Sequence, residues 1–208
     1  MIQSPLNYTG GKFRLLPQLL PLFPTNIETF VDLFCGGCNV GINVNASQYL
    51  YNDANPYLIN LYNALKNNSK EATLKTIYGI IEEYGLSLSS KNGYDYYGCE
   101  SGRGLGSYNK DKYFKMREDF NSCVDRGDDY YIMLYVLIVY SFNNQIRFNR
   151  SGKFNLPVGK RDFNKKMEDK LLAFIDALQA QNSCFSCFDF DDFDVSGLTE
   201  RDFVYLDP

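Results

Sequence analysis

The chain has 208 residues, of which 45% are hydrophobic, and its formal net charge is −4. The apolar content supports a packed core, and the length allows one large domain or a core with an insert. The longest apolar run, residues 130–142, is shorter than the roughly 20 residues of a membrane-spanning helix, which excludes that class. Because the N-terminus has no secretory signal, we expect a cytoplasmic protein with no membrane partner and with six free thiols.

Charge is distributed unevenly along the chain. Residues 141–166 contain seven basic side chains and one acid, a local charge of +6, whereas residues 188–208 contain seven acids and one arginine, a local charge of −6. A basic segment on an otherwise acidic chain is typical of a nucleic-acid-binding face. An ordinary solvated loop is the alternative interpretation.

The first motif is a glycine pair near the N-terminus. Gly10 and Gly11 precede Lys12 and an apolar segment, residues 13–22, which we expect to be helical and to kink or restart at Pro17. Such a loop can approach a ligand closely, and Lys12 is placed to meet an anionic group such as a carboxylate. The alternative is a helix start with a solvated lysine.

A second glycine motif follows an apolar run. Residues 30–34 predict a buried strand, Gly36 and Gly37 predict a tight turn, and residues 40–47, which include Gly41, predict a helix. Glycine permits positive φ and close approach of the backbone to a ligand, although the same pattern occurs where a turn merely packs tightly.

An acidic residue ends the next predicted strand. Residues 49–52 read as a strand, and Asp53 follows seventeen positions after Gly36. In a βαβ unit, an acid at this place accepts hydrogen bonds from ribose hydroxyls; the alternative is a local turn residue. Asn55 and Pro56 then begin a helix, as its N-cap and its first residue.

The remaining chain predicts a mainly helical segment and a return to strands. We expect helices over residues 71–84, 113–120, 129–140 and 170–181, a mobile glycine-rich loop over 86–109, a short strand over 184–188 and a buried strand over 203–206. Residues 142–159 mix amides, arginines and aromatics, and predict a hairpin with its tip near Ser151 and Gly152. Asn and Arg can pair with adenine and guanine edges.

Two C-x-x-C pairs have the spacing of zinc ligands. We reject a zinc site because Cys35 and Cys38 lie inside the glycine turn, where they would compete with a ligand, and Cys184 and Cys187 point to opposite faces of a strand. The chain contains no histidine, which excludes histidine-based catalysis or metal binding. We expect no metal.

Six sequence blocks occur together in one order. They are residues 7–12, 32–37, 52–55, 113–121, 147–157 and the pair Asp207-Pro208. This ordered set resembles the Dam-type DNA adenine-N6 methyltransferases, which use S-adenosylmethionine (SAM). The resemblance implies an α/β fold with a Rossmann-like methyltransferase sheet, incomplete at its C-terminus, over residues 1–68 and 168–208. It also implies a helical target-recognition insert over 69–167, with a DNA-recognition hairpin at about 142–160.

The resemblance also implies which residues bind SAM and act on adenine. The implied cofactor residues are Tyr8, Gly10, Gly11, Lys12, Asp32, Phe34, Gly36, Gly37, Asp53 and Asp207. Tyr8 and Lys12 would lie near the methionine end of SAM, and Asp53 would hold the ribose. Asp207 and the Pro208 carbonyl would accept hydrogen bonds from the adenine N6 amino group.

Duplex DNA is the substrate that the resemblance implies. The implied DNA-binding residues are Asn143, Gln145, Arg147, Asn149, Arg150, Lys153 and Pro157. Arg147 would read a guanine, Asn143 and Gln145 would lie near the gap left by a flipped adenine, and Pro157 would contact a neighbouring base. A cognate restriction endonuclease is a possible partner in a restriction-modification or phage system.

The chain departs from the family pattern at several positions. The family motif is Asp-Pro-Pro-Tyr, and this chain stops after Pro208, so we expect an enzyme truncated inside its catalytic motif and inactive as given. Cys38 replaces the usual third glycine, Gln145 replaces an apolar residue, and the usual phenylalanine before Gly159 is missing, which leaves the recognition sequence open. Two alternatives remain. One is a non-catalytic SAM- or DNA-binding module, and the other is an RNA adenine methyltransferase, whose relatives usually carry Asn in place of Asp207.

Overall fold

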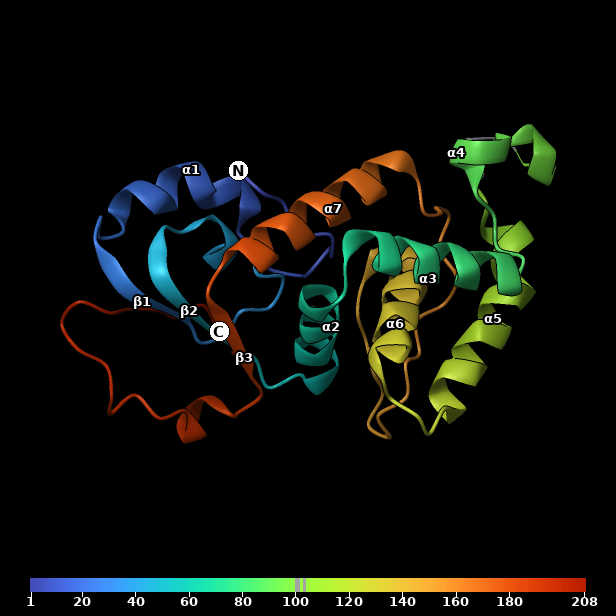
Figure 1. Ribbon diagram of the computed structural model, residues 1–208. Coiled ribbons are helices and arrows are strands. Elements are labelled where there is room, and N and C mark those ends of the chain that lie inside the picture. Colours follow the sequence, from blue (N-terminus) through green and yellow to red (C-terminus); the bar gives the residue numbers. More distant parts are fainter. Residues whose placement is uncertain (100–101, 103) are drawn as a thin grey trace. The chain divides into compact units, whose positions relative to one another are not determined.

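The computed structural model describes residues 1–99, 102 and 104–208 (Figure 1). Internal contacts divide the chain into two compact units. The first consists of residues 1–5, 10–67 and 170–208, and the second of residues 6–9 and 68–169. The glycine-rich loop predicted over 86–109 includes residues 100, 101 and 103, which lie outside the described part of the chain.

A parallel sheet forms the centre of the first unit. Its strands are β1 (Ile27–Asp32), β2 (Ala46–Asn52), β3 (Ser183–Ser186) and β4 (Phe203–Tyr205), in the order β3-β2-β1-β4. All three neighbouring pairs are parallel. Parallel strands joined through helical crossovers are the mark of an α/β fold, so the predicted Rossmann-like sheet is confirmed.

Short helical segments flank this sheet. They are η1 (Phe13–Leu15), α1 (Leu16–Leu19), η2 (Leu20–Leu22), η3 (Gly41–Asn43), α2 (Pro56–Asn67), η6 (Phe190–Asp192) and the part of α7 (Lys165–Ala180) from Lys170 on. Pro17 lies in the first turn of α1, where its missing N–H costs nothing. Asn55 caps α2, since its Oδ1 accepts a hydrogen bond from Tyr57 N at 3.1 Å.

The prediction of a helix over residues 40–47 was wrong. Only the single 3-10 turn η3 forms there, and β2 already begins at Ala46. Val44 is extended, and the Tyr49 hydroxyl donates to Val44 O and accepts from Ala46 N, each at 3.0 Å. The carbonyl of Val44 and the N–H of Ala46 thus find hydrogen-bond partners without forming a helix. Strand β2 therefore begins three residues before its predicted start.

Aromatic rings cover one face of the sheet. The ring centroid of Phe23 lies 4.9 Å from that of Phe203 on β4. The ring centroid of Tyr62 on α2 lies 5.6 Å from that of Phe185 on β3. Strand β4, predicted to be buried, is only half-buried because β1 is its one partner within the described sheet, and Leu206 is 60% exposed.

The third glycine of the motif has a packing role. A Cβ added to Gly41 would lie 2.2 Å from Cε1 of Tyr51. Tyr51 is fully buried, its ring stacks on Phe185, and its hydroxyl donates to Gln181 Oε1 at 2.7 Å. The close approach of η3 to this ring therefore requires glycine at position 41.

Helices make up most of the second unit. They are α3 (Lys70–Glu83), α4 (Ser89–Asn92), η4 (Asp95–Tyr97), α5 (Gly106–Ser122), α6 (Asp128–Tyr140), η5 (Phe142–Asn144) and the first residues of α7. Helix α6 packs against both α3 and α5 (Figure 1) and is almost entirely buried, as its continuous apolar sequence predicts.

The segment over 86–109 was predicted as a loop, yet it contains α4, η4 and the start of α5. Helix α5 begins at Gly106, seven residues before its predicted start. The buried amide of Asn109 explains this difference: its Oδ1 accepts from Ser87 N at 2.8 Å and its Nδ2 donates to Ser87 Oγ at 2.9 Å. This contact is non-local, so sequence periodicity does not register it.

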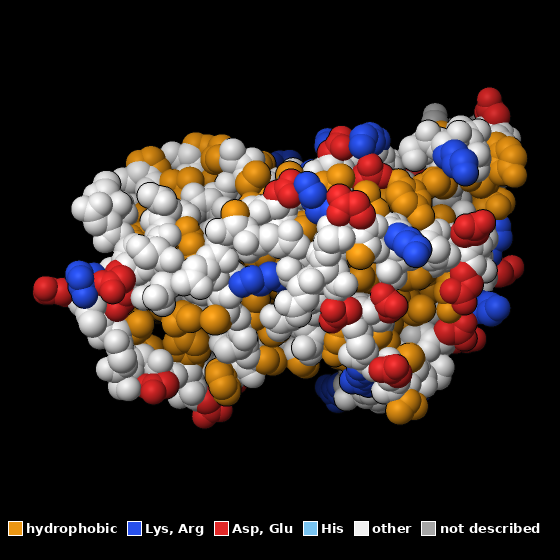
Figure 2. Space-filling model, in the orientation of Figure 1, with side chains coloured by type: hydrophobic (Ala, Val, Ile, Leu, Met, Phe, Trp, Pro, Cys, Tyr) orange, Lys and Arg blue, Asp and Glu red, His pale blue; other side chains and the backbone are white. Residues whose placement is uncertain are grey.

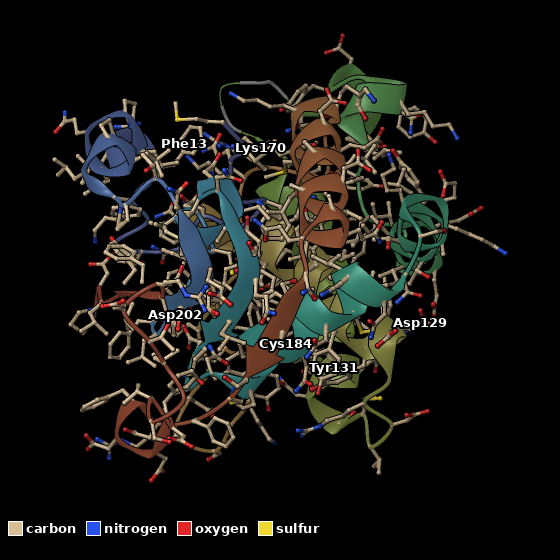
Figure 3. The ribbon with its side chains drawn as sticks, turned by 60° about the vertical axis from the view of Figure 1, so that its left-hand side comes forward. Phe13, Asp129, Tyr131, Lys170, Cys184 and Asp202 are labelled. Carbon is tan, nitrogen blue, oxygen red and sulfur yellow. The ribbon has the colours of Figure 1, made fainter. Side chains whose placement is uncertain are left out.

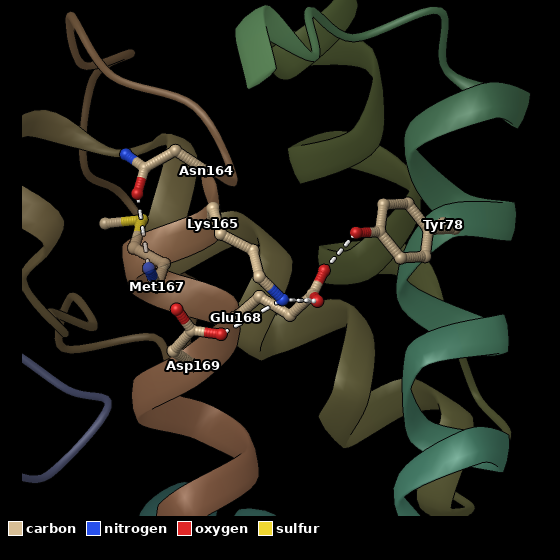
Figure 4. Close-up of polar contacts among 6 residues, drawn as sticks. All are labelled: Tyr78, Asn164, Lys165, Met167, Glu168 and Asp169. Carbon is tan, nitrogen blue, oxygen red and sulfur yellow. Dashed lines mark hydrogen bonds and ion pairs between the residues drawn. The ribbon is translucent and has the colours of Figure 1, made fainter. Parts of the chain in front are cut away.

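Helix α7 also begins earlier than predicted, at Lys165 (Figure 4). Asn164 Oδ1 accepts a hydrogen bond from Met167 N at 3.2 Å and so caps the helix. Glu168 accepts from Lys165 and from the Tyr78 hydroxyl of α3, and these bonds lower the pKa of Glu168. Partial burial and the Glu168 carboxylate raise the pKa of Tyr78 to about 12.

Charged side chains of both signs share the surface of the helical unit. Figure 2 shows Lys and Arg interspersed with Asp and Glu over its helices. In the described part of the chain, no helix is both long and apolar enough to cross a membrane.

Two glycine substitutions should change stability in opposite directions. Gly41→Ala should destabilise the protein by about 1 to 3 kcal/mol, because the new methyl group overpacks Tyr51. Gly79→Ala, in helix α3, should stabilise it by about 0.5 to 1 kcal/mol, because nothing lies within 4 Å of the new Cβ and alanine favours a helix. Chemical denaturation of both variants measures the difference, and a Gly41→Ala protein as stable as wild type would disprove the packing role.

Candidate functional site

The strand order marks the edge of the sheet beside β1 as a candidate ligand site. Strand β2 and then β3 lie on one side of β1, whereas β4 lies on the other. Ligands of open parallel sheets bind at such a reversal, beyond the carboxyl ends of the strands. The residues that follow β1 and β4 there are the glycine turn, 33–37, and Asp207.

The glycine turn is held by bonds from neighbouring elements. Cys35 N donates to Asn52 O at 2.8 Å, Gly36 N donates to Asp53 Oδ2 at 3.0 Å, and the Tyr62 hydroxyl of α2 donates to Gly36 O at 2.6 Å. Gly36 has φ 45°, which favours glycine. Gly37 follows in the same turn and is buried. Contacts within the chain therefore fix the shape of the turn.

Asp53 holds this turn together. Its Oδ2 accepts from Gly36 N, and its Oδ1 accepts from Asn55 N at 2.9 Å. A carboxylate has about four acceptor positions, so two backbone bonds leave capacity for further donors. Asp53 is half-buried at the carboxyl end of β2, the place that a ribose-binding acid requires. Both sequence interpretations of Asp53 thus remain compatible with its geometry.

Sequence reasoning missed the part played by Asn52. Asn52 is 1% exposed, and its Nδ2 donates to Leu33 O at 3.2 Å and to Phe188 O at 3.0 Å. Its Oδ1 accepts from Phe188 N at 3.0 Å. One buried amide thus joins the ends of β1 and β3. An amide directly after the apolar run 49–51 was the sequence signal.

An exposed aromatic residue beside the turn was also missed. Phe190, in η6, is 52% exposed, and its ring centroid lies 5.8 Å from that of Phe34. Sequence reasoning counted this segment only for its acids. Figure 3 shows the segment leaving β3, where Cys184 is labelled, and returning to Asp202, whose Oδ1 accepts from Thr29 N of β1 at 2.9 Å.

Three carboxyl groups, those of Asp32, Asp53 and Asp207, lie at this edge of the sheet. Asp32 is 2% exposed, and burial raises its pKa to about 7. A hydrogen bond from the Gly41 backbone opposes this shift, while the charges of Asp207 and Asp53 add to it. Such an edge favours a cationic ligand.

Lys12 meets one of these acids. Its Nζ lies 2.6 Å from Asp207 Oδ2 and donates to Gly10 O at 3.0 Å. The side chains of Lys12 and Asp207 are each 28% exposed, so both can be reached from solvent. The anionic group expected near Lys12 is therefore, in this structure, a carboxylate of the chain itself. Gly10 has φ 79°, and Gly11 and Pro208 are exposed.

The cysteines of the turn are buried and free. Burial raises the pKa of both the Cys35 and the Cys38 thiols, which keeps them protonated and poorly reactive.

Among residues 1–99, 102 and 104–208, no group of three or more acidic or cysteine side chains could hold a metal ion.

The predicted hairpin forms in the second unit. Bridges join Ser141 to Val158 and Phe148 to Phe154, and Gly152, at φ 69°, turns the chain at the predicted tip. Asn149 builds this tip, because its Oδ1 accepts from the backbone N–H groups of Ser151 and Lys153, each at 3.0 Å. Arg150, Lys153 and Pro157 are exposed.

A polar cavity lies at the base of the hairpin. It has a volume of about 360 Å³ and is lined by Asn7, Ser141, Phe142, Asn143, Asn144, Lys160 and Arg161. Asn143 and Asn144 have φ 57° and 53°, and Asn7 Nδ2 donates to Asn143 O at 2.8 Å. Gln145 is half-buried beside them in the chain. Amides and cations here match the edges and phosphates of nucleic acid.

The predicted residues fall into two groups. Lys12, Asp32, Phe34, Gly36, Gly37, Asp53 and Asp207 all belong to the first unit, with Gly10, Gly11 and Pro208. Tyr8 and all seven predicted DNA-binding residues belong to the second. Arg147 is exposed on the hairpin, and its guanidinium donates to Asn155.

Comparison with known proteins identifies DNA methyltransferases as relatives. A type II methyltransferase, M.FokI of Planomicrobium okeanokoites, is 42% identical over the whole chain, and the modification methylase StsI of Streptococcus sanguinis is 40% identical. The chain spans 29% and 28% of the lengths of these relatives. A DNA adenine methylase of Haemophilus influenzae is 30% identical over 98% of the chain and 62% of its own length.

A protein-family model, described as D12 class N6 adenine-specific DNA methyltransferase, matches residues 8–208. The match covers both units, including the glycine turn, the hairpin and Asp207. The chain therefore belongs to the D12 class of N6 adenine-specific DNA methyltransferases.

Proposed function

We propose that the protein transfers a methyl group from SAM to the N6 atom of adenine in duplex DNA, and that this chain supplies the cofactor wall and the recognition hairpin. The observation that carries the proposal is the position of the Gly36 turn, Asp53 and Asp207 after the carboxyl ends of β1, β2 and β4, where the strand order reverses. Family membership supports the same reaction.

The residues at this edge suit a cationic nucleotide-like cofactor. The Gly36 turn offers backbone without a side chain, Asp53 has spare acceptor capacity for ribose hydroxyls, and Phe34 with Phe190 offers aromatic surface for an adenine ring. Bound SAM would supply an electrophilic methyl group on a positively charged sulfur. Asp32 and Asp207 favour that charge, and Tyr8 and Lys12 are proposed to lie at the methionine end.

Asp207 is proposed to act on adenine. The N6 lone pair is conjugated with the ring and is a poor nucleophile, so acceptors for its hydrogens favour the charge that develops during attack. The Asp207 carboxylate and the Pro208 carbonyl are the proposed acceptors. Lys12 holds Asp207 Oδ2 at 2.6 Å, which orients the carboxylate and leaves Oδ1 for the amino group.

DNA recognition is assigned to the hairpin of the second unit. Its exposed cations, Arg147, Arg150 and Lys153, suit phosphates and guanine, while Asn143, Gln145, Asn149 and Pro157 complete the proposed DNA-binding set. The target adenine would be flipped from the duplex to reach Asp207. We propose a cytoplasmic protein of a restriction-modification system, with a cognate endonuclease as its partner.

Incubation with labelled SAM and a mixed-sequence duplex tests the proposal. We expect N6-methyladenine in the DNA after the incubation. SAM binding without any methyl transfer would favour the non-catalytic module, and methylation of RNA alone would favour the other alternative.

Asp53→Ala should weaken SAM binding about 10- to 100-fold, since hydrogen bonds to a charged group contribute roughly 1.5 to 3 kcal/mol. The substitution also releases Gly36 N, so the turn that contacts the cofactor loosens. Calorimetric titration measures the dissociation constant. Glu28→Ala, at the amino end of β1, is the control and should leave binding unchanged. An unaltered constant for Asp53→Ala would argue against the ribose role.

SAM binding should tighten as the pH rises from about 6 to about 8. The pKa of Asp32 is raised to about 7, so its carboxyl group is mainly neutral below this pH and charged above it. The charged form favours a cationic ligand. Asp32→Asn should flatten this part of the pH dependence of the dissociation constant. The amine of SAM titrates equally for both proteins, so equal slopes would rule out Asp32 as the source.

Arg147→Ala should relax sequence discrimination at one guanine, by about 1 to 3 kcal/mol if the contact is bidentate. Selection of bound sequences from a random duplex library measures the preference at each position. An equal loss of affinity for all sequences would instead identify Arg147 as a phosphate contact.

A further inference from the structure

One face of helix α5 is attached to the returning arm of the hairpin. Tyr113, Arg117 and Asn121 follow one another at intervals of four residues, so they lie along one stripe of the helix. The Tyr113 hydroxyl donates to Leu156 O at 3.1 Å, and Arg117 Nη1 donates to the same oxygen at 2.9 Å. Two side chains of α5 thus fix the backbone at residue 156.

Asn121 fixes the backbone two residues earlier. Its Nδ2 donates to Phe154 O at 3.0 Å, and its Oδ1 accepts from Phe154 N at 2.8 Å. The Asn121 amide thus bonds both the N–H and the C=O of Phe154, as the backbone of a neighbouring strand would. Phe154 is 1% exposed, and its ring packs against Phe120 and Phe148. Residue 154 is therefore fixed by both its backbone and its side chain.

Asn155 lies between these two fixed residues and faces across the hairpin. Its Oδ1 accepts from Arg147 Nε at 2.8 Å, and its carbonyl oxygen accepts from Arg147 Nη2 at 3.2 Å. Its backbone N–H donates to Arg147 O at 3.3 Å. Asn155 therefore holds both the backbone and the guanidinium of Arg147.

Asn155 bonds to one edge of the Arg147 guanidinium and leaves another edge for a ligand. Arginine has five N–H donors, and Asn155 takes one from Nε and one from Nη2. The opposite end, formed by Nη1 and the second Nη2 hydrogen, keeps two parallel donors. Two parallel donors are what O6 and N7 of guanine accept. An arginine held in this orientation loses less side-chain freedom when it binds a base.

We propose that Asn155 is a positioning residue that orients Arg147 for guanine, and that Asn121 of α5 sets the position of Asn155 through the Phe154 backbone. Sequence discrimination then depends on a helix that need not touch the base. This inference rests on the proposed function, in which Arg147 reads a guanine.

The test compares variants in a random duplex selection, with Arg147→Ala identifying the guanine concerned. Asn155→Ala should reduce preference for that guanine about tenfold, within the range for a bidentate contact, while affinity for unrelated duplex stays within about twofold. Asn155→Asp keeps an acceptor for Nε and should keep the preference. Asn121→Ala should reduce it, whereas Asn60→Ala, which removes an amide bonded to Pro56 within α2, should not.

A second measurement follows the arginine directly. Exchange of the Arg147 Nε hydrogen with water, measured by NMR, should be faster in Asn155→Ala than in wild type, because its acceptor is gone. Thermal unfolding identifies any variant that does not fold; Asn155, half-buried on the hairpin, carries the test if Asn121→Ala fails.

The outcomes distinguish failure of the proposed function from failure of the positioning role of Asn155. If wild type selects no motif, the proposed function fails. If wild type selects a guanine through Arg147 and Asn155→Ala keeps the full preference, the positioning role is wrong. A uniform loss of affinity in Asn155→Ala would make Asn155 a phosphate contact, which also overturns the inference.

Discussion

The hydrogen bond between Gly36 N and Asp53 Oδ2 is the constraint on which the candidate site depends. It joins the end of β1 to the end of β2, and Asn52 extends this connection to Leu33 and to the segment after β3. The strands of a parallel sheet all end at one edge, but their loops need not have a fixed shape there. Buried polar contacts of Asp53 and Asn52 supply that shape in this structure.

Sequence patterns predicted the elements that have a strong local signal. The strand leading into Gly36, the Asn55 cap and the hairpin tip at Gly152 were all identified from propensity and spacing. The failures concern the first residues of β2, α5 and α7. Local side-chain bonds set the starts of β2 and α7, through the Tyr49 hydroxyl and the Asn164 cap, whereas the non-local contact of Asn109 with Ser87 sets the start of α5.

The contacts at the candidate site could not be predicted from the sequence, even where both partners were named as site residues. Lys12 and Asp207 were each expected at the site, yet their ion pair joins positions 195 residues apart and no local pattern contains it. The raised pKa of Asp32 is similar, because the charges that add to the effect of burial, those of Asp207 and Asp53, come from two other segments of the chain. Types of residue follow from sequence motifs, whereas charges and pKa values follow from the tertiary fold.

In both units, a side-chain carboxylate or amide holds a backbone segment in place through hydrogen bonds. In the first, a carboxylate or amide fixes a turn against which a charged ligand can lie; in the second, the Asn121 amide fixes a strand whose next residue holds an arginine. An arginine on a free loop would bind phosphate as readily as guanine, because its charge attracts both. In the proposed recognition, the Asn155 bonds set the angle of the guanidinium, and the contacts of α5 with the hairpin backbone set the position of Asn155.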